Sequence, residues 1–177
     1  HAFDRDPHVE KYVNTLQDKR RIRFYNEKFS QMYKTLTKQK IYKVDGVLLD
    51  LGLSSMQLDQ GERGFSFQKQ GDLKMTMGCN TTNAATLVNT LTTNELNKNI
   101  SEYGEEPKAK KIAQAIVEYR RSKNITTTQE LKDIIVGAIG STRRGKIHSA
   151  TLSFQALRIA VNDEMEELQN GIKAAFE

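Results

Sequence analysis

The sequence predicts an α/β protein in which a parallel sheet is followed by an all-helical block. Short strand-like runs occupy the first third of the chain, and the apolar run 47–49 has the composition of a strand buried on both faces. From about residue 60 onward these runs disappear and apolar residues recur at helical spacing. An all-helical block that interrupts an α/β pattern is typical of an inserted domain.

The composition indicates a soluble protein with a modest core. The 177 residues are 37% hydrophobic and 28% charged, with a mean hydropathy of −0.62. No apolar run approaches the length of a membrane span, which argues against an integral membrane role. The formal net charge of +5 is compatible with a polyanionic partner such as nucleic acid, although many proteins without such a partner are equally basic.

Cysteine and histidine are too few and too scattered to predict a metal site. Cys79 is the single cysteine, and the three histidines lack the spacing of zinc ligands. A lone cysteine cannot form an internal disulfide, which fits a reducing compartment such as the cytoplasm.

The first strand is predicted at residues 2–3, and two acidic residues follow it. Pro7 then opens a helix over about 7–16, since proline at the first helical position loses no hydrogen bond. In doubly wound folds an acidic residue after a strand accepts hydrogen bonds from ribose hydroxyls. Asp4 and Asp6 both fit this role, and Asp6 fits equally well as a helix cap.

Two further strand-like segments precede the helical block. Residues 21–25 alternate polar and apolar, and the run 47–49 ends at Asp50, where a small, polar segment that includes Ser54 begins. Ligands of open α/β sheets bind outside the carboxyl ends of the strands. Asp50 is therefore a candidate ligand-facing residue, with a capping aspartate before a turn as the alternative.

A short helix is predicted over about 32–36, directly after Phe29. From its place after a strand, the Phe29 ring can flank an adenine, although a core residue is the default interpretation of a single aromatic.

The rest of the chain is predicted to be helical. Apolar spacing and capping signals predict helices over about 83–91, 92–103, 109–121, 127–139 and 151–176, with Gly104 and Gly140 as stops and the last helix unbroken. The expected division is a sheet domain at 1–60, a helical block at 61–148 and a returning helix at 149–177. The helix from about 109 has a basic face and the loop 141–146 is basic; each suits phosphate binding as well as ordinary solvation.

Short motifs spread along the chain resemble those of one known family. The central segment reads Asp50-Leu51-Gly52-Leu53-Ser54-Ser55, Gln57-Leu58-Asp59 and Glu62-Arg63-Gly64-Phe65-Ser66-Phe67. Further motifs are Phe3-Asp4-Arg5-Asp6-Pro7, Tyr103-Gly104-Glu105-Glu106, Lys110-Lys111-Ile112-Ala113 and the run from Ser153 to Glu164. In this order, over essentially the whole chain, they resemble the MraW family of S-adenosylmethionine-dependent methyltransferases, which act on a cytosine N4 in small-subunit ribosomal RNA. Met56 is similar to alphaproteobacterial and mitochondrial relatives, so the mitochondrial matrix is the alternative compartment.

The resemblance implies a fold, a cofactor and site residues. The fold is a Rossmann-like methyltransferase domain, partial in this chain, with an inserted all-helical recognition domain. The cofactor is S-adenosylmethionine: Asp4 binds its ribose, Phe29 flanks its adenine, and Asp50 and Gln57 also contact it. Asp50 and Ser54 are candidate catalytic residues, since an acceptor near the target amine stabilises positive charge as the amine attacks.

The implied partner is small-subunit ribosomal RNA or the small ribosomal subunit. The candidate RNA-binding residues are Lys108, Lys110, Lys111, Arg143, Arg144 and Lys146.

Several residues depart from the family pattern. Residues 71–77 align with a motif usually read Gly-Pro-Leu-Asp-Met-Arg-Met but carry Asp72, Lys74 and Thr76, and Ser149 and Leu152 stand where the family tends to have proline and arginine. The alternative function is therefore a catalytically impaired or non-catalytic RNA-binding relative. A nicotinamide-dependent dehydrogenase has little support, because the chain contains no Gly-x-Gly-x-x-Gly.

We also expect these 177 residues to be an internal part of a family protein. In the family, a strand and a glycine-rich loop that holds the methionine part of the cofactor precede the Phe3-Asp4 segment, and further strands follow the last helix. The chain alone is expected to show helix by circular dichroism, without measurable S-adenosylmethionine binding or turnover.

Overall fold

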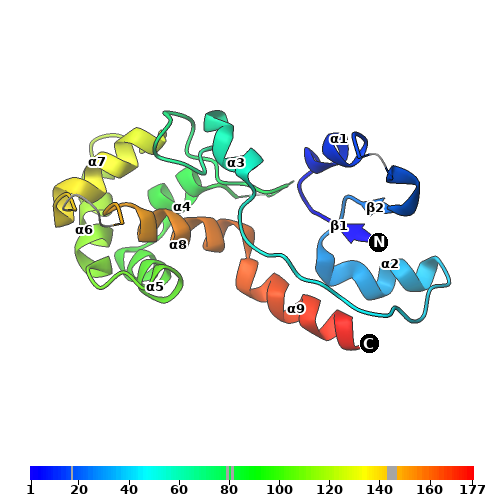
Figure 1. Cartoon of the computed structure of the whole chain (residues 1–177). Helices are drawn as coiled ribbons and strands as arrows, with labels where there is room; N and C mark the ends of the chain where they lie inside the picture. Colours follow the sequence, from blue (N-terminus) through cyan, green and yellow to red (C-terminus); the bar gives the residue numbers. More distant parts are fainter. Residues whose placement is uncertain (17, 79, 81, 143–146) are drawn as a thin grey trace. The chain divides into compact units, whose positions relative to one another are not determined.

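The computed structural model describes residues 1–177 apart from 17, 79, 81 and 143–146 (Figure 1). The chain divides into two compact units. Unit 1 comprises residues 1–51, 77–79 and 163–177, and unit 2 comprises residues 52–76 and 80–162.

Unit 1 contains a short parallel sheet. β1 (Ala2–Phe3) pairs with β2 (Phe24–Tyr25), and the rings of Phe3 and Tyr25 stack with their centroids 4.7 Å apart. The other elements of the unit are α1 (Val9–Val13), the 3-10 helices η1 (Lys19–Arg21) and η2 (Phe29–Gln31), α2 (Met32–Lys38) and α9 (Glu164–Phe176), of which α9 packs on η2 and α2. Two predicted strands are thus confirmed, although the second is shorter than expected because Arg21 ends η1 instead of entering the strand.

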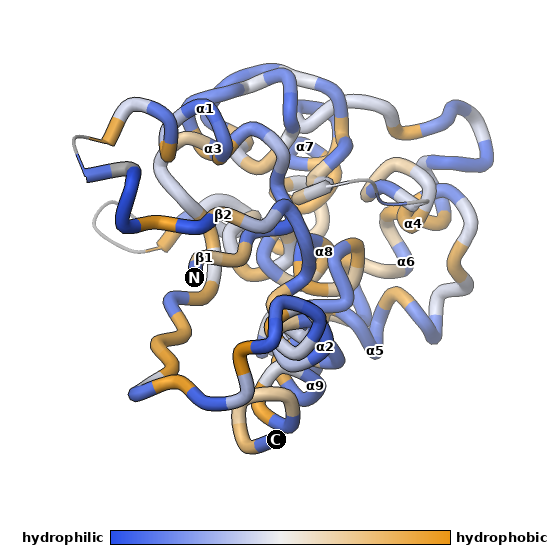
Figure 2. The backbone as a smooth tube through the Cα atoms, turned by 90° about the vertical axis from the view of Figure 1, so that its right-hand side faces the viewer, coloured by the Kyte–Doolittle hydropathy of each residue, from blue (hydrophilic) through white to orange (hydrophobic). Residues whose placement is uncertain are grey.

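The apolar segment 47–49 does not form the buried strand that the sequence predicts. It lies between α2 and α3 (Ser55–Asp59), in a stretch without helix or strand (Figure 1). Val47 is 43% exposed and Leu48 is 92% exposed, and Figure 2 shows hydrophobic stretches along this connection. A strand needs a partner for its backbone N–H and C=O groups, and no strand among the described residues pairs with this segment. The prediction is wrong here because composition cannot supply that partner.

Unit 2 is helical. Its elements are α3, the 3-10 helix η3 (Gly61–Arg63), α4 (Ala84–Thr90), α5 (Thr93–Gly104), α6 (Ala109–Arg120), α7 (Thr128–Ile139) and α8 (Thr151–Asn162). α5 packs against α6 and α8, and α6 also packs against α7. The core is built from fully buried aliphatic side chains, including Val88, Leu96, Ile100, Ile112, Ile116, Leu131, Ile135 and Leu157. Each contributes about 1.5–3 kcal/mol by leaving water, so these amphipathic faces hold the unit together.

The helix starts of unit 2 follow the capping signals. The Thr92 and Thr127 side chains accept from the N–H groups of Glu95 and Glu130, whose carboxylates accept in return, which confirms both predicted capping boxes. Gly140 ends α7 with φ 82°, as predicted.

Gly104 does not stop α5, contrary to the prediction. It is the last residue inside the helix, and the left-handed cap is Glu105 with φ 53°. A Cβ on Gly104 would overlap the carbonyl oxygen of Leu152, so this glycine allows α8 to approach α5 closely.

The last helix is not continuous, contrary to the prediction. Asp163 adopts a left-handed conformation (φ 50°) and separates α8 from α9. Aspartate tolerates this conformation better than most residues, and the apolar period runs through the break, so periodicity alone does not reveal it.

Candidate functional site

Unit 1 contains a cavity at the sheet that brings together two of the expected site residues. Its volume is about 720 Å³. Its lining comprises His1 and the two residues of β1, then Phe29, Met32 and Leu36, and finally residues 41 and 43–51. Phe29 and Asp50 therefore face the same cavity, and the volume lies in the range of small-molecule sites.

Asp4 lies at the carboxyl end of β1, next to Phe3 of the cavity wall. Its backbone N–H donates to the Tyr25 carbonyl oxygen (3.2 Å), and its Oδ1 accepts from the Asp6 N–H (2.8 Å). Asp4 itself does not line the cavity.

Asp6, the other candidate for the ribose, is fully buried. Its Oδ1 accepts from the backbone N–H of His8 (3.0 Å) and lies 2.9 Å from His8 Nδ1. The Asp6 carboxylate thus stabilises the turn that leads into α1.

Phe29 begins η2 and lines the cavity, and its ring contacts α9. A Cβ on Gly171 would overlap the Phe29 ring, so the ring lies directly against the backbone of α9. The next residue, Ser30, donates from its backbone nitrogen and its hydroxyl to the two oxygens of Glu167, each at 2.9 Å.

Ser54 and Gln57 lie in unit 2 and form a capping box at the start of α3. The Ser54 hydroxyl accepts from the Gln57 N–H (3.3 Å), and Gln57 Oε1 accepts from the Ser54 N–H (3.1 Å). Ser54 is exposed and Gln57 is buried. The Ser-x-x-Gln spacing was a readable signal for this cap, which the sequence reasoning missed because it assigned both residues to the site.

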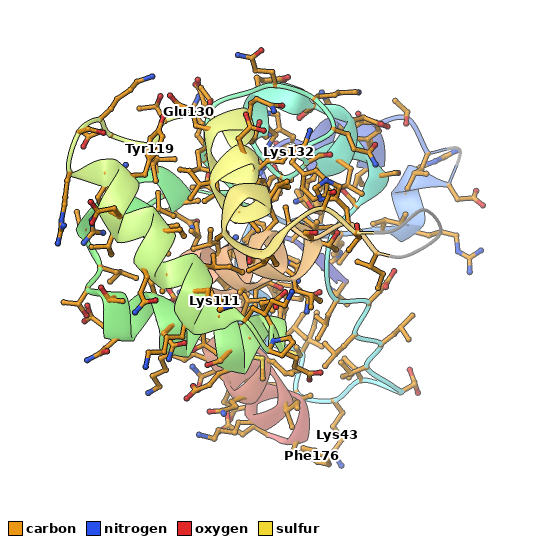
Figure 3. The ribbon with its side chains drawn as sticks, turned by 90° about the vertical axis from the view of Figure 1, so that its left-hand side faces the viewer. Lys43, Lys111, Tyr119, Glu130, Lys132 and Phe176 are labelled. Carbon is orange, nitrogen blue, oxygen red and sulfur yellow. The ribbon has the colours of Figure 1, made fainter. Side chains whose placement is uncertain are left out.

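The candidate RNA-binding residues of α6 differ in how they are engaged. Lys108 Nζ donates to the Ile139 carbonyl oxygen (3.2 Å) at the end of α7. Lys110 and Lys111 are exposed on α6, where Figure 3 labels Lys111. Arg143, Arg144 and Lys146 lie outside the described residues.

Other basic groups of α6 have structural partners. Arg120 donates to the Val88 carbonyl oxygen (2.7 Å), and Arg121 pairs with Glu118 (2.6 Å). Lys110 and Lys111 are therefore the better candidates for a phosphate contact on this face.

The segment that departs from the family motif is well anchored in unit 2. Leu73 N–H donates to the Thr126 carbonyl oxygen (2.8 Å), and Asp72 forms a β-bridge with Thr127. Lys74 Nζ lies 2.8 Å from Asp72 Oδ2, so two of the altered residues form an ion pair with each other. The carbonyl oxygen of Thr76 accepts from Arg63 Nη2 (2.9 Å).

The departure at Ser149 also has a local partner, since its hydroxyl donates to the Gly140 carbonyl oxygen (2.7 Å). At Leu152 the backbone lies against Gly104, a contact that does not depend on the side chain.

Neither a metal cluster nor a membrane span occurs in the described part of the chain. Within 1–177 without the gaps named above, no three His, Cys, Asp or Glu side chains are placed to hold a metal ion. No helix in that same part of the chain is long and apolar enough to cross a membrane.

The sequence reasoning also missed Glu167 and Gly171. In the helical pattern both fall beside the apolar stripe, so periodicity predicts them to be exposed, whereas both are buried in unit 1. Their partners lie more than 130 residues away in the chain, at Phe29 and Ser30.

Comparison with known proteins identifies the family. Residues 1–177 match the model of the MraW methylase family. Ribosomal RNA small subunit methyltransferase H of Caulobacter vibrioides is 47% identical over 174 residues, which cover 98% of this chain and 55% of that protein. The protein of that name in a Wolbachia strain from Drosophila simulans is 46% identical over 100% of this chain and 61% of its own length. The one in Ehrlichia canis is 42% identical over 98% of this chain and 60% of its own length. The chain therefore spans little more than half the length of the relatives it matches, and it belongs to the MraW methylase family.

Proposed function

We propose that this protein transfers a methyl group from S-adenosylmethionine to the N4 amine of a cytidine in small-subunit ribosomal RNA. The observation that carries the proposal is the unit 1 cavity, which Phe29 and Asp50 both line, in a chain whose whole length matches a methylase family. The names of the Caulobacter, Wolbachia and Ehrlichia relatives support small-subunit ribosomal RNA as the substrate.

The cavity has the chemistry that an adenosine-containing cofactor needs. An aromatic ring gives the adenine a stacking partner, and carboxylates accept from ribose hydroxyls. In this proposal Phe29 flanks the adenine, Asp4 accepts from the ribose, and Asp50 and Gln57 make the remaining contacts. Asp4 is favoured over Asp6 because the Asp6 side chain is fully buried, whereas Asp4 directly follows β1 and is not fully buried.

Asp50 and Ser54 remain the candidate catalytic residues. The N4 amine is a poor nucleophile because its lone pair is delocalised into the ring, so rate depends mainly on how it is positioned. A carboxylate such as Asp50 stabilises the positive charge that develops on the attacking amine. The bound cofactor supplies the methyl group on its sulfonium.

Testing Ser54 requires a variant that distinguishes a role of its hydroxyl in methyl transfer from its role as the N-cap of α3. Ser54→Asp keeps an N-cap acceptor for α3 and removes the hydroxyl, whereas Ser54→Ala removes both. If the hydroxyl takes part in methyl transfer, kcat falls in both variants while only Ser54→Ala loses stability.

Residues 61–148, most of which belong to unit 2, are proposed to be the inserted helical domain that recognises RNA. Lys110 and Lys111 supply phosphate contacts, with Lys108, Arg143, Arg144 and Lys146 as further candidates. The target base has to be unpaired or flipped out of its stack to reach a methyl donor.

The second candidate is a non-catalytic RNA-binding relative, which the departures at Asp72, Lys74 and Thr76 favour. Two observations favour the enzyme instead. The Asp72–Lys74 ion pair offsets the altered charges, and the backbone of this segment is anchored to the start of α7.

The test uses the Caulobacter vibrioides relative with its matched residues replaced by this chain, hereafter the chimera. It is incubated with methyl-labelled S-adenosylmethionine and small-subunit ribosomal RNA that lacks the modification, and the digested RNA is analysed by mass spectrometry. The proposal predicts N4-methylcytidine, with the unaltered relative as positive control. A folded chimera that binds the RNA and leaves it unmethylated would favour the non-catalytic alternative.

A further inference from the structure

The buried residues of helix α9 in unit 1 are not those of its apolar stripe. Glu167 and Gly171 lie one helical turn apart on the same face, and both are buried. Met165 and Ile172, which belong to the apolar stripe, are 46% and 43% exposed. The contacts of α9 within unit 1 therefore involve the Glu167 carboxylate and Gly171. Burial of apolar side chains alone does not explain how α9 packs in this unit.

The Glu167 carboxylate fixes the backbone of η2. Its two oxygens accept from the backbone N–H and the hydroxyl of Ser30, each at 2.9 Å, and Lys28 Nζ lies 4.0 Å away. Burying a carboxylate is costly unless it is hydrogen-bonded, and here both oxygens are used on a single residue of η2. The backbone is thus held at the residue directly after Phe29.

Gly171 fixes the place of the Phe29 ring. A Cβ at position 171 would overlap two carbon atoms of the ring, so any larger residue forces the ring to move. Phe29 also lines the cavity together with Asp50. A larger residue at position 171 would therefore displace the side chain of a residue that lines the cavity.

We propose that Glu167 and Gly171 are positioning residues for the adenine part of the cofactor site. Glu167 holds the backbone of η2, and Gly171 leaves the space that sets the orientation of the Phe29 ring. The two contacts act on consecutive residues, Phe29 and Ser30, and so define both the place and the tilt of the ring. This proposal rests on the proposed function, since it requires an adenine beside Phe29.

The experiment measures S-adenosylhomocysteine affinity of the chimera by calorimetry. Gly171→Ala is expected to weaken binding about tenfold, which corresponds to about 1.4 kcal/mol, because the displaced ring stacks less well on the adenine. Glu167→Ala is expected to act in the same direction, and Glu167→Gln less, because the amide retains one acceptor oxygen. The KM for RNA is expected to stay unchanged in all three variants.

A matched control separates positioning from helix stability. Gly137→Ala lies in α7 with open space around the new Cβ, so it tests the same chemical change without a ring contact. It is expected to leave affinity unchanged. In a Phe29→Leu background, Gly171→Ala is expected to add no further loss, because the ring that it displaces is gone.

The outcomes separate this proposal from the one it rests on. A parent chimera that methylates no RNA and binds no S-adenosylhomocysteine overturns the proposed function. A parent that binds, with a Gly171→Ala variant that is folded by circular dichroism and binds equally well, overturns the positioning role alone. If Gly171→Ala fails to fold, Ser30→Ala decides: it removes one hydrogen bond to Glu167, and unchanged affinity in that variant overturns the proposal.

Discussion

Asn162, the last residue of α8, donates a 2.7 Å hydrogen bond from Nδ2 to the carbonyl oxygen of Met75. Met75 is fully buried and adopts a left-handed conformation (φ 58°), which is strained for a residue with a side chain. The same amide group donates to the Arg158 carbonyl oxygen (2.9 Å). The buried amide of Asn162 is thus one of the groups that hold this segment, which departs from the family motif, in its strained conformation.

We predict that Asn162→Ala lowers the free energy of unfolding by about 1–3 kcal/mol, the cost of leaving a buried carbonyl without its donor. Urea denaturation followed by circular dichroism measures the difference. Asn94→Ala, on the exposed side of α5, is the matched control and should change stability little. Equal effects of the two substitutions would show that the Asn162–Met75 bond does not hold the segment.

Stability at low pH should depend on Glu130. Hydrogen bonding from Lys123, and then from the Thr126 N–H, lowers the pKa of Glu130 from 4.5 to about 2. A carboxyl group with a lowered folded pKa contributes stability that is present above its unfolded pKa and is lost as the pH falls through its folded pKa.

The free energy of unfolding should therefore fall between about pH 4.5 and pH 2, and Glu130→Gln should make this fall shallower. Urea denaturation at a series of pH values gives the slopes. Glu118→Gln, at an exposed carboxylate of α6, serves as the control. A slope that Glu130→Gln leaves unchanged would contradict the role given to this capping residue.

Local signals in the sequence predicted much of unit 2. Thr92 with Glu95 and Thr127 with Glu130 carry their capping partners three residues away, so the helix starts could be read directly. The break between α8 and α9 at Asp163 could not be predicted, because the apolar residues keep the same helical period on both sides of it.

Unit 1 was harder to predict because its decisive contacts are between distant parts of the chain. The 47–49 run has strand composition but no described strand partner, and the buried carboxylate of Glu167 accepts its hydrogen bonds from Ser30, 137 residues away. The cavity residues Phe29 and Asp50 were found through family motifs. Composition and periodicity alone favoured a purely structural interpretation of each, as a capping aspartate and a core phenylalanine.

RNA binding should depend on Lys110 and Lys111 through phosphate charge. Replacing both with Ala is expected to reduce the slope of log K against log salt by about 0.7–0.9 for each phosphate that is no longer neutralised. Fluorescence anisotropy with a labelled small-subunit RNA fragment measures this slope. Lys98→Ala, an exposed lysine on α5, is the control.

The basic residues outside the described part of the chain need their own variant. Joint replacement of Arg143, Arg144 and Lys146 should lower the salt slope as well, by the same amount for each phosphate that these side chains neutralise. If neither set changes RNA affinity or its salt dependence, both basic surfaces are merely solvated.

The most direct measurement is the affinity of the chimera for S-adenosylhomocysteine with and without the Asp4 carboxylate. Charge-assisted hydrogen bonds to the ribose correspond to about 1.5–3 kcal/mol, so Asp4→Ala should weaken binding by roughly 10- to 150-fold in calorimetry. Asp18→Ala, at an exposed carboxylate of unit 1, should bind as the parent does. Equal affinity of the Asp4→Ala variant and the parent would contradict the assignment of the cofactor site to this end of the sheet.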